Sequence, residues 1–166
     1  MRKHILLLIT LLATLEVTAQ NNENFYFSNL NLKDGLSQIS VLKIFQDTKG
    51  FIWFGTRNGL NRYDGSEFVI YKHDPKDSLT LSDNHIWSLA EDNDRNLWVG
   101  TARGLNKLDL KTNRIKPFVD ERYGAFAKSE VRCLTVDSRN RLWIGTTKGL
   151  YLYVPCLLYT SDAADE

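Results

Sequence analysis

The part of this sequence that most suggests site chemistry is the acidic run at residues 92–96, Asp-Asn-Asp-Arg-Asn. An Asp-x-Asp-x-Asn pattern opens the calcium loop of an EF-hand, where carboxylate and amide oxygens at alternate positions surround the ion. That loop also needs a glycine at its sixth position and a bidentate glutamate at its twelfth. Here those positions hold Leu97 and Arg103, so we interpret the run as a polar turn.

Other candidate groups are few. His73 and His85 have no acidic or cysteine partners at metal-ligand spacing, and no Ser-His-Asp arrangement or nucleophile elbow occurs. We therefore predict no catalytic, metal or cofactor-binding residues and no cofactor. Trp87 is the one tryptophan outside the repeat described next, and it either stacks on a sugar ring or fills space between sheets.

The sequence between residues 36 and 153 is organised as a repeat of 45 residues. The motif Trp-x-Gly-Thr, followed shortly by Gly-Leu, begins at Trp53, Trp98 and Trp143. An aspartate stands six residues before each tryptophan, at Asp47, Asp92 and Asp137. Self-similarity at a fixed period of this length is the mark of a repeat architecture.

Each copy predicts four short antiparallel strands separated by turns rich in Asp, Asn and Gly. In the first copy the predicted strands are Val41–Gln46, Phe51–Thr56, Leu60–Tyr63 and Glu67–Tyr71. A four-stranded unit of about 40–50 residues in tandem is typical of a β-propeller blade. The predicted fold class is all-β: a partial β-propeller of about three four-stranded blades whose ring is incomplete.

The repeated residues have predicted structural roles. The tryptophan is expected to fill the space between neighbouring blades, and the aspartate to lock the first turn by accepting backbone hydrogen bonds. Gly55, two residues after Trp53, is expected to leave room for that ring, as are its counterparts. Cys133 is predicted to be a half-buried strand residue.

The repeat also divides the chain. We assign residues 20–35 to an N-terminal strand that could close the ring, 36–80 to blade 1, 81–125 to blade 2 and 126–155 to a truncated blade 3. Residues 1–19, with a basic start, an apolar stretch and small residues before Gln20, are interpreted as a signal peptide. Residues 156–166 abandon the pattern and are interpreted as a non-native, adapter-derived tail.

The composition excludes several classes of protein. A formal net charge of +1 gives no electrostatic reason to expect a nucleic-acid partner. With two cysteines in 166 residues, one of them in the tail, a disulfide scaffold is not expected either.

The repeat resembles the two-component regulator propeller repeat. The resemblance rests on Asp-Gly-Leu-Ser-Gln at residues 34–38, the Asp-x-x-Gly turn, Trp-x-Gly-Thr, Gly-Leu and the aromatic-Asp at residues 63–64, and it covers roughly residues 25–154. The second copy has Asn96 where the turn glycine is usual, and the third has Val154 in place of the closing Asp.

The resemblance implies the periplasmic, ligand-sensing region of a hybrid two-component histidine kinase anchored in the inner membrane of a glycan-degrading bacterium. Oligosaccharides are the implied ligands. The implied partners are further blades, a downstream sensor domain and a second copy in a homodimer. No kinase or receiver motif occurs in this sequence, so we expect a non-enzymatic N-terminal fragment with unknown ligand-binding residues. A secreted propeller lyase or glycosidase and a protein-docking scaffold remain as alternatives.

Overall fold

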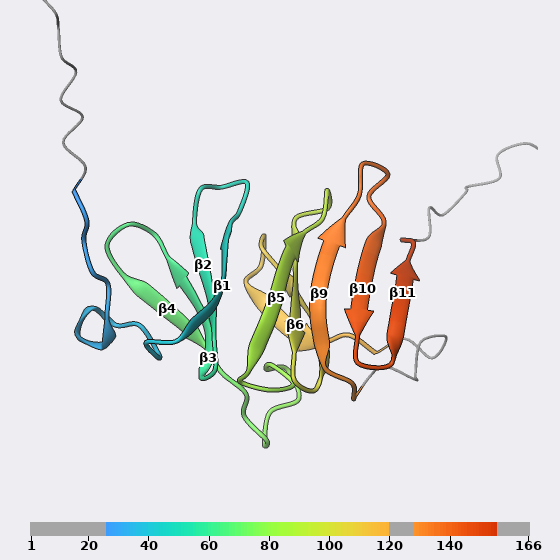
Figure 1. Cartoon of the computed structure of the whole chain (residues 1–166), viewed down its shortest axis with the longest axis horizontal. Helices are drawn as coiled ribbons and strands as arrows, with labels where there is room; N and C mark the ends of the chain where they lie inside the picture. Colours follow the sequence, from blue (N-terminus) through green and yellow to red (C-terminus); the bar gives the residue numbers. More distant parts are fainter. Residues whose placement is uncertain (1–25, 120–127, 156–166) are drawn as a thin grey trace, which may run out of the picture.

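The computed structural model describes residues 26–119 and 128–155, and it is built from β-strands (Figure 1). The predicted signal peptide at 1–19 and the predicted tail at 156–166 lie outside the described residues. In the described part, no helix combines the length and apolar character that crossing a membrane requires.

Three antiparallel sheets follow one another along the chain, each with its strands in sequence order. The first contains β1 (Val41–Gln46), β2 (Ile52–Thr56), β3 (Gly59–Tyr63) and β4 (Phe68–Tyr71). The second contains β5 (Ile86–Glu91), β6 (Asn96–Thr101), β7 (Gly104–Asp109) and β8 (Arg114–Pro117). The third contains β9 (Val131–Val136), β10 (Leu142–Thr146) and β11 (Gly149–Tyr153). The all-β, blade-like prediction is confirmed, with three described strands in the last sheet.

The first strands of the sheets, β1, β5 and β9, lie side by side, and the later strands extend away from them (Figure 1). This is the arrangement of successive propeller blades, whose first strands line the axis. The described strands form part of such a ring and do not close it.

Two apolar layers hold the three sheets together. Trp53 is fully buried between the first and second sheets, among side chains that include Leu89 and Val99. Trp98 is 1% exposed and packs between the second and third sheets, against Leu142 and Ile144. The repeated tryptophan thus fills the space between blades, as predicted.

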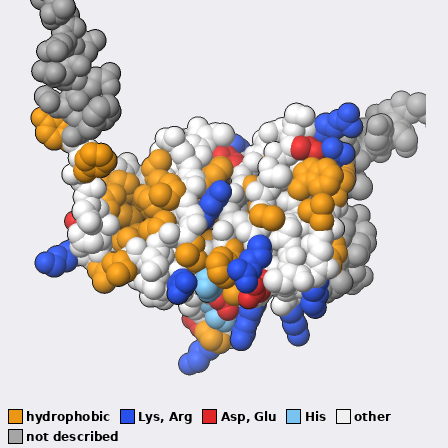
Figure 2. All heavy atoms as spheres, viewed as in Figure 1, with side chains coloured by type: hydrophobic (Ala, Val, Ile, Leu, Met, Phe, Trp, Pro, Cys, Tyr) orange, Lys and Arg blue, Asp and Glu red, His pale blue; other side chains and the backbone are white. Residues whose placement is uncertain are grey.

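The two outer faces of the described structure lack this cover. Ile44 is 62% exposed, whereas its counterpart in the second sheet, Leu89, is 2% exposed. Trp143 is only partly buried, unlike Trp53 and Trp98. A broad apolar surface over β1–β4 is visible in Figure 2. Each outer face therefore has the surface that an adjacent blade covers elsewhere in the molecule.

The repeated aspartate locks the first turn of each sheet more completely than predicted. The Asp47 carboxylate accepts hydrogen bonds from the backbone N–H groups of Lys49 (2.9 Å) and Phe51 (3.0 Å). It also accepts one from the indole Nε1 of Trp53 at 2.8 Å. The six-residue spacing exists because the aspartate fixes both the turn and the tryptophan ring.

Three predictions need correction. No strand forms over the described part of residues 20–35: residues 26–30 have no ladder partner, and a short 3-10 helix, η1 (Leu32–Asp34), follows them. A strand requires a neighbour for its backbone groups, and none lies beside this segment; ring closure by it stays a prediction.

The glycine two residues after Trp53 and after Trp98 makes room for the next blade instead of for the ring. A Cβ placed on Gly55 would lie 2.8 Å from Ile86 Cγ2, and one on Gly100 would lie 2.7 Å from Val131 Cγ1. At these two positions a second strand closely approaches the first strand of the adjacent sheet, and at Gly100 the Ser88 hydroxyl of the same sheet also fills the space. Cys133 is exposed, not half-buried, because no further sheet covers its side of β9 in the described structure.

Candidate functional site

Loops from all three sheets gather at one end of the molecule, which we call the loop end. It contains the loop 72–85 before β5 and the two-residue turns that join the second and third strands of each sheet, at residues 57–58, 102–103 and 147–148. Figure 1 shows these segments together at the lower edge.

Backbone hydrogen bonds fix the turns of the loop end, one of them between the first and second blades and two within a blade. The N–H of Gly59 donates to the Asn84 carbonyl at 2.8 Å, and the N–H of Ala102 donates to the His85 carbonyl at 3.0 Å. The third sheet has a similar bond, from Thr147 to the Glu130 carbonyl at 3.2 Å. Each of these turns is therefore held by a residue that leads into β5 or β9.

The repeated Leu-Ser pair fixes the loops to the sheets. The Ser82 N–H donates to Asn106 Oδ1 at 2.8 Å, and its hydroxyl lies 2.9 Å from Thr101 Oγ1. Ser37 makes the same bonds to the first sheet. The third copy, at residues 126–127, lies outside the described residues.

Each first strand enters its sheet with a β-bulge, and this feature creates the candidate site. The register shifts in β1, β5 and β9 leave one unpaired residue in each strand: Leu42, Trp87 and Arg132. A bulge breaks the alternation of a strand and re-aims a side chain. The three bulged residues lie in corresponding positions at the loop end of three neighbouring strands.

Trp87 is the centre of a small cluster there. Its ring stacks on His85, with centroids 4.1 Å apart and planes 28° apart. The guanidinium carbon of Arg132 lies 4.1 Å from the Trp87 ring centroid, and Arg132 forms an ion pair with Glu130. We call His85, Trp87, Glu130 and Arg132 the loop-end cluster.

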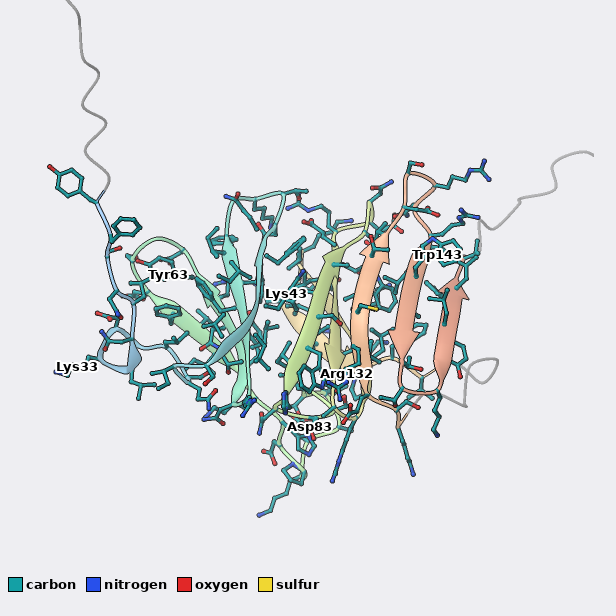
Figure 3. The ribbon with its side chains drawn as sticks, viewed as in Figure 1. Lys33, Lys43, Tyr63, Asp83, Arg132 and Trp143 are labelled. Atoms are coloured by element: carbon teal, nitrogen blue, oxygen red, sulfur yellow. The ribbon has the colours of Figure 1, made fainter. Side chains whose placement is uncertain are left out.

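Polar groups of this cluster remain unused within the described structure. The Trp87 Nε1 and His85 Nε2 atoms are buried without a hydrogen-bond partner. The Arg132 side chain is 49% exposed despite its ion pair. Figure 3 shows Lys43 and Arg132 on the same face of the molecule, with Asp83 just below Arg132.

The turns of the loop end also carry exposed cations. Arg57, Arg103 and Lys148 stand on the three successive turns of the loop end, and all three residues are exposed. Arg103 is paired with Asp83, from its Nε to the Asp83 Oδ2 at 3.7 Å. Figure 2 shows basic, acidic and histidine side chains mixed at this edge. The arrangement is suited to binding and has no evident nucleophile with its base.

The acidic run at residues 92–96 is a structural turn at the opposite end. Asp92 is 7% exposed and accepts hydrogen bonds from Trp98 Nε1 at 2.7 Å and from the Asn96 backbone N–H at 2.9 Å. Its oxygens are therefore occupied by the fold. In the third copy, the hydrogen bond from the Trp143 indole lowers the pKa of Asp137, with further hydrogen bonds from Arg141.

The two histidines are not brought together as ligands. The backbone N–H of His73 donates to Asn84 Oδ1 at 2.8 Å, and its Nδ1 contacts the Leu81 carbonyl, so His73 holds the loop before β5. No group of three potential metal-ligating side chains occurs within residues 26–119 and 128–155.

Comparison with known families identifies the repeat. The family model described as "Two component regulator propeller" matches residues 35–58, 80–103 and 126–148, one match in each unit. The chain carries two-component regulator propeller repeats. These regulator propeller repeats contain the turn aspartate and, in the first two units, the Leu-Ser pair whose hydrogen bonds are described above.

Known proteins with similar sequence or structure agree with the regulator propeller assignment. Over 61 residues, 37% of this chain, the sequence is 51% identical to Histidine kinase P4 of Formosa agariphila. The extracellular domain of the putative one component system BT4673 from B. thetaiotaomicron matches 78% of the chain with a TM-score of 0.61 and 26% identity. PorZ of Porphyromonas gingivalis matches 68% with a TM-score of 0.55 and 17% identity, which shows the fold alone.

The chain spans only a small part of these proteins: 4% of Histidine kinase P4, 17% of the BT4673 domain and 19% of PorZ.

Proposed function

We propose that this chain is a ligand-sensing part of the periplasmic propeller region of a two-component sensor, and that its ligands are oligosaccharides released from glycans. The observation that carries the proposal is the set of three regulator propeller matches in 45-residue register. The 51% identity to a protein named as a histidine kinase supports it, as does the likeness to an extracellular domain of a one component system. Export through the sequence at residues 1–19 is part of the same proposal.

The sensing role does not require catalysis by this chain. The loop end offers an aromatic ring, guanidinium groups and carboxylates already engaged in ion pairs, which are groups that bind and orient a ligand. The partners in this proposal are further blades and a downstream sensor domain of the full-length protein, which would act as a membrane-anchored homodimer. Phosphoryl transfer would belong to a kinase domain elsewhere in that protein.

Calorimetric titration of the chain with oligosaccharides from depolymerised bacterial, plant and algal polysaccharides tests the proposal. We expect saturable heat with a subset of the oligosaccharides. Mass spectrometry of the same mixtures after prolonged incubation distinguishes a sensor from a lyase or glycosidase, because a sensor leaves the oligosaccharide masses unchanged. Absence of binding across the whole series would contradict glycan sensing and favour a protein-docking scaffold.

A further inference from the structure

A cavity of about 180 Å³ lies between the first and second sheets, at the end of the molecule opposite the loop end. The first sheet lines it with the turn after β1 and with side chains of β2 and β3, and the second sheet with residues of the turn between β7 and β8. We call it the seam cavity. Among the described residues that line it, the cations are Lys49, Arg62 and Lys111 and the carboxylate is Asp47.

Arg62 is held in place at the seam cavity but has an unused donor. Its guanidinium carbon lies 4.7 Å from the centroid of the Phe51 ring, and its Nη1 donates to Asn113 Oδ1 of the second sheet at 3.3 Å. The Arg62 Nε is buried and has no hydrogen-bond partner within residues 26–119 and 128–155. A buried N–H of a charged group is costly without an acceptor, so an acceptor inside the cavity stabilises this arrangement.

Lys49 directs a second cation to the same place from the first turn. Its Nζ donates to the Leu110 carbonyl at 3.2 Å, which holds the ammonium group between the two sheets. An ammonium group has three donors, so two of them remain for another acceptor. Lys111 follows Leu110 on the facing turn and is exposed. Cationic donors therefore reach the cavity from both sheets.

The titratable groups near these cations do not supply the missing acceptor. The Asp47 oxygens accept three hydrogen bonds, from its own turn and from the repeated tryptophan. Asp109 balances part of the charge of Lys111, and it accepts hydrogen bonds from two backbone N–H groups of its own turn. Burial raises the pKa of Tyr71, so the phenol near Arg62 is uncharged. Three cations against two carboxylates leave the cavity positive.

The blade fold does not require this pair of cations. The second repeat has Asp94 at the position of Lys49 and Lys107 at the position of Arg62. Its turn and strands form as those of the first repeat do. The positive charge is therefore a property of the boundary between the first two sheets and not of the repeat.

We propose that the seam cavity binds a small oxyanion of the sulfate or phosphate type, held between the first two blades by Arg62 Nε and Lys49 Nζ. Guanidinium groups bind such anions through directed hydrogen bonds, and lysine adds a point charge. Donors that arrive from two sheets suit a tetrahedral anion, whose acceptors point in several directions, better than a planar carboxylate. Because its contacts come from both sheets, the bound anion stabilises the boundary between them. The proposal does not depend on glycan sensing.

The direct test is a titration of the full, nitrogen-labelled chain followed by NMR. Inorganic sulfate, inorganic phosphate and a monosaccharide sulfate ester are each added in exchange for chloride at constant ionic strength. The Arg62 Nε–H signal reports the proposed contact, and we expect it to shift saturably with sulfate or phosphate. A tighter response to the ester than to both free ions would assign the site to an ester group of a larger molecule, and the reverse would assign it to the free ion.

The second repeat supplies the test substitutions. Arg62→Lys, Lys49→Asp and the control Arg57→Ala each install the residue that the second repeat has at the same position, so the fold is expected to be preserved. Arg62→Lys retains the charge but loses the Nε donor, and losing one charge-assisted hydrogen bond should weaken binding by about tenfold to hundredfold in calorimetric titration. Lys49→Asp should weaken binding at least as much. Arg57→Ala removes an exposed cation at the loop end and should bind as wild type.

Thermal melting checks that each variant is folded and provides a second measurement. Sulfate and phosphate stabilise many proteins because they are excluded from the protein surface, and the wild type and all variants share that effect. We expect an additional rise in Tm for the wild type and Arg57→Ala alone. An Arg62 Nε–H signal that does not shift saturably, or equal binding by Lys49→Asp and the wild type, overturns the proposal and indicates that water fills the cavity.

Discussion

Replacing Asp92 with alanine tests whether the repeated aspartate holds each blade together. The carboxylate accepts hydrogen bonds from Trp98 Nε1 at 2.7 Å, from the Asn96 backbone N–H at 2.9 Å and from Asn96 Nδ2 at 2.9 Å. Trp98 is 1% and Asn96 8% exposed, so water cannot readily replace the acceptor. Leaving these three buried donors unpaired at about 1–3 kcal/mol each predicts a loss of roughly 3–9 kcal/mol.

The assay is urea denaturation followed by tryptophan fluorescence and by far-ultraviolet circular dichroism. Asp94→Ala is the matched control, since Asp94 is exposed in the same turn and should change stability by no more than about 0.5 kcal/mol. Trp98→Phe removes the principal donor, so combining it with Asp92→Ala should cost less than the sum of the two single changes. A stability loss below about 0.5 kcal/mol for Asp92→Ala, or equal losses for Asp92→Ala and Asp94→Ala, would refute the reasoning.

Three further predictions concern packing, pH and thiol exposure. Gly100→Ala places a Cβ 2.7 Å from both Cγ1 and the carbonyl oxygen of Val131, so we expect a loss of about 1–3 kcal/mol in the same denaturation assay; wild-type stability would contradict the close approach of blades. The backbone N–H of Glu67 is the main cause that lowers the pKa of Asp64 to about 2. Because its pKa is lowered, Asp64 binds fewer protons in the folded chain than in the unfolded one. Its contribution to the free energy of unfolding is therefore complete above its unfolded pKa of about 4 and is lost as the pH falls toward 2. An NMR titration of this carboxyl group with a midpoint near 4 would contradict the prediction. Cys133 is exposed, so in a variant whose other cysteine is replaced by serine it should react with a thiol reagent as fast in the native protein as in urea. Slower reaction in the native protein would show that the Cys133 side chain is covered.

The strands could be predicted because turn residues punctuate them. The prediction of Val41–Gln46 coincides with β1, and the second and fourth strands begin one residue later than predicted. Asp, Asn and Gly leave the chain little alternative to a turn at these points. The predicted strand ends lie close to the observed ones because each 45-residue copy has turn residues at the same positions.

Contacts between blades could not be predicted in the same way. Residue parity correctly places Gly55 on the same side of the strand as Trp53, but it does not show which neighbour approaches that side. The neighbour is Ile86, from a different sheet. The exposure of Cys133 has the same origin, because it depends on the sheets that flank β9 and not on β9 itself.

Only part of the loop-end cluster could be predicted from the sequence. Trp87 stands out because it departs from the repeat, whereas Arg132 looks like an ordinary variable residue at the same position. The next position varies as well, with Lys43, Ser88 and Cys133, so the sequence pattern does not single out the pair. The ring-to-guanidinium distance of 4.1 Å appears only when β5 and β9 are placed side by side.

Hydrogen exchange of the backbone amides, with and without an oligosaccharide that lacks sulfate and phosphate groups and binds in the calorimetric titration, tests ligand sensing at the loop end most directly. Binding there should slow exchange at the start of β5 and β9 and in the turns at residues 102–103 and 147–148. The turns at the opposite end, at residues 47–50, 92–95 and 137–140, serve as internal controls and should not change. Protection confined to those opposite turns, or none at saturating oligosaccharide, would contradict the account.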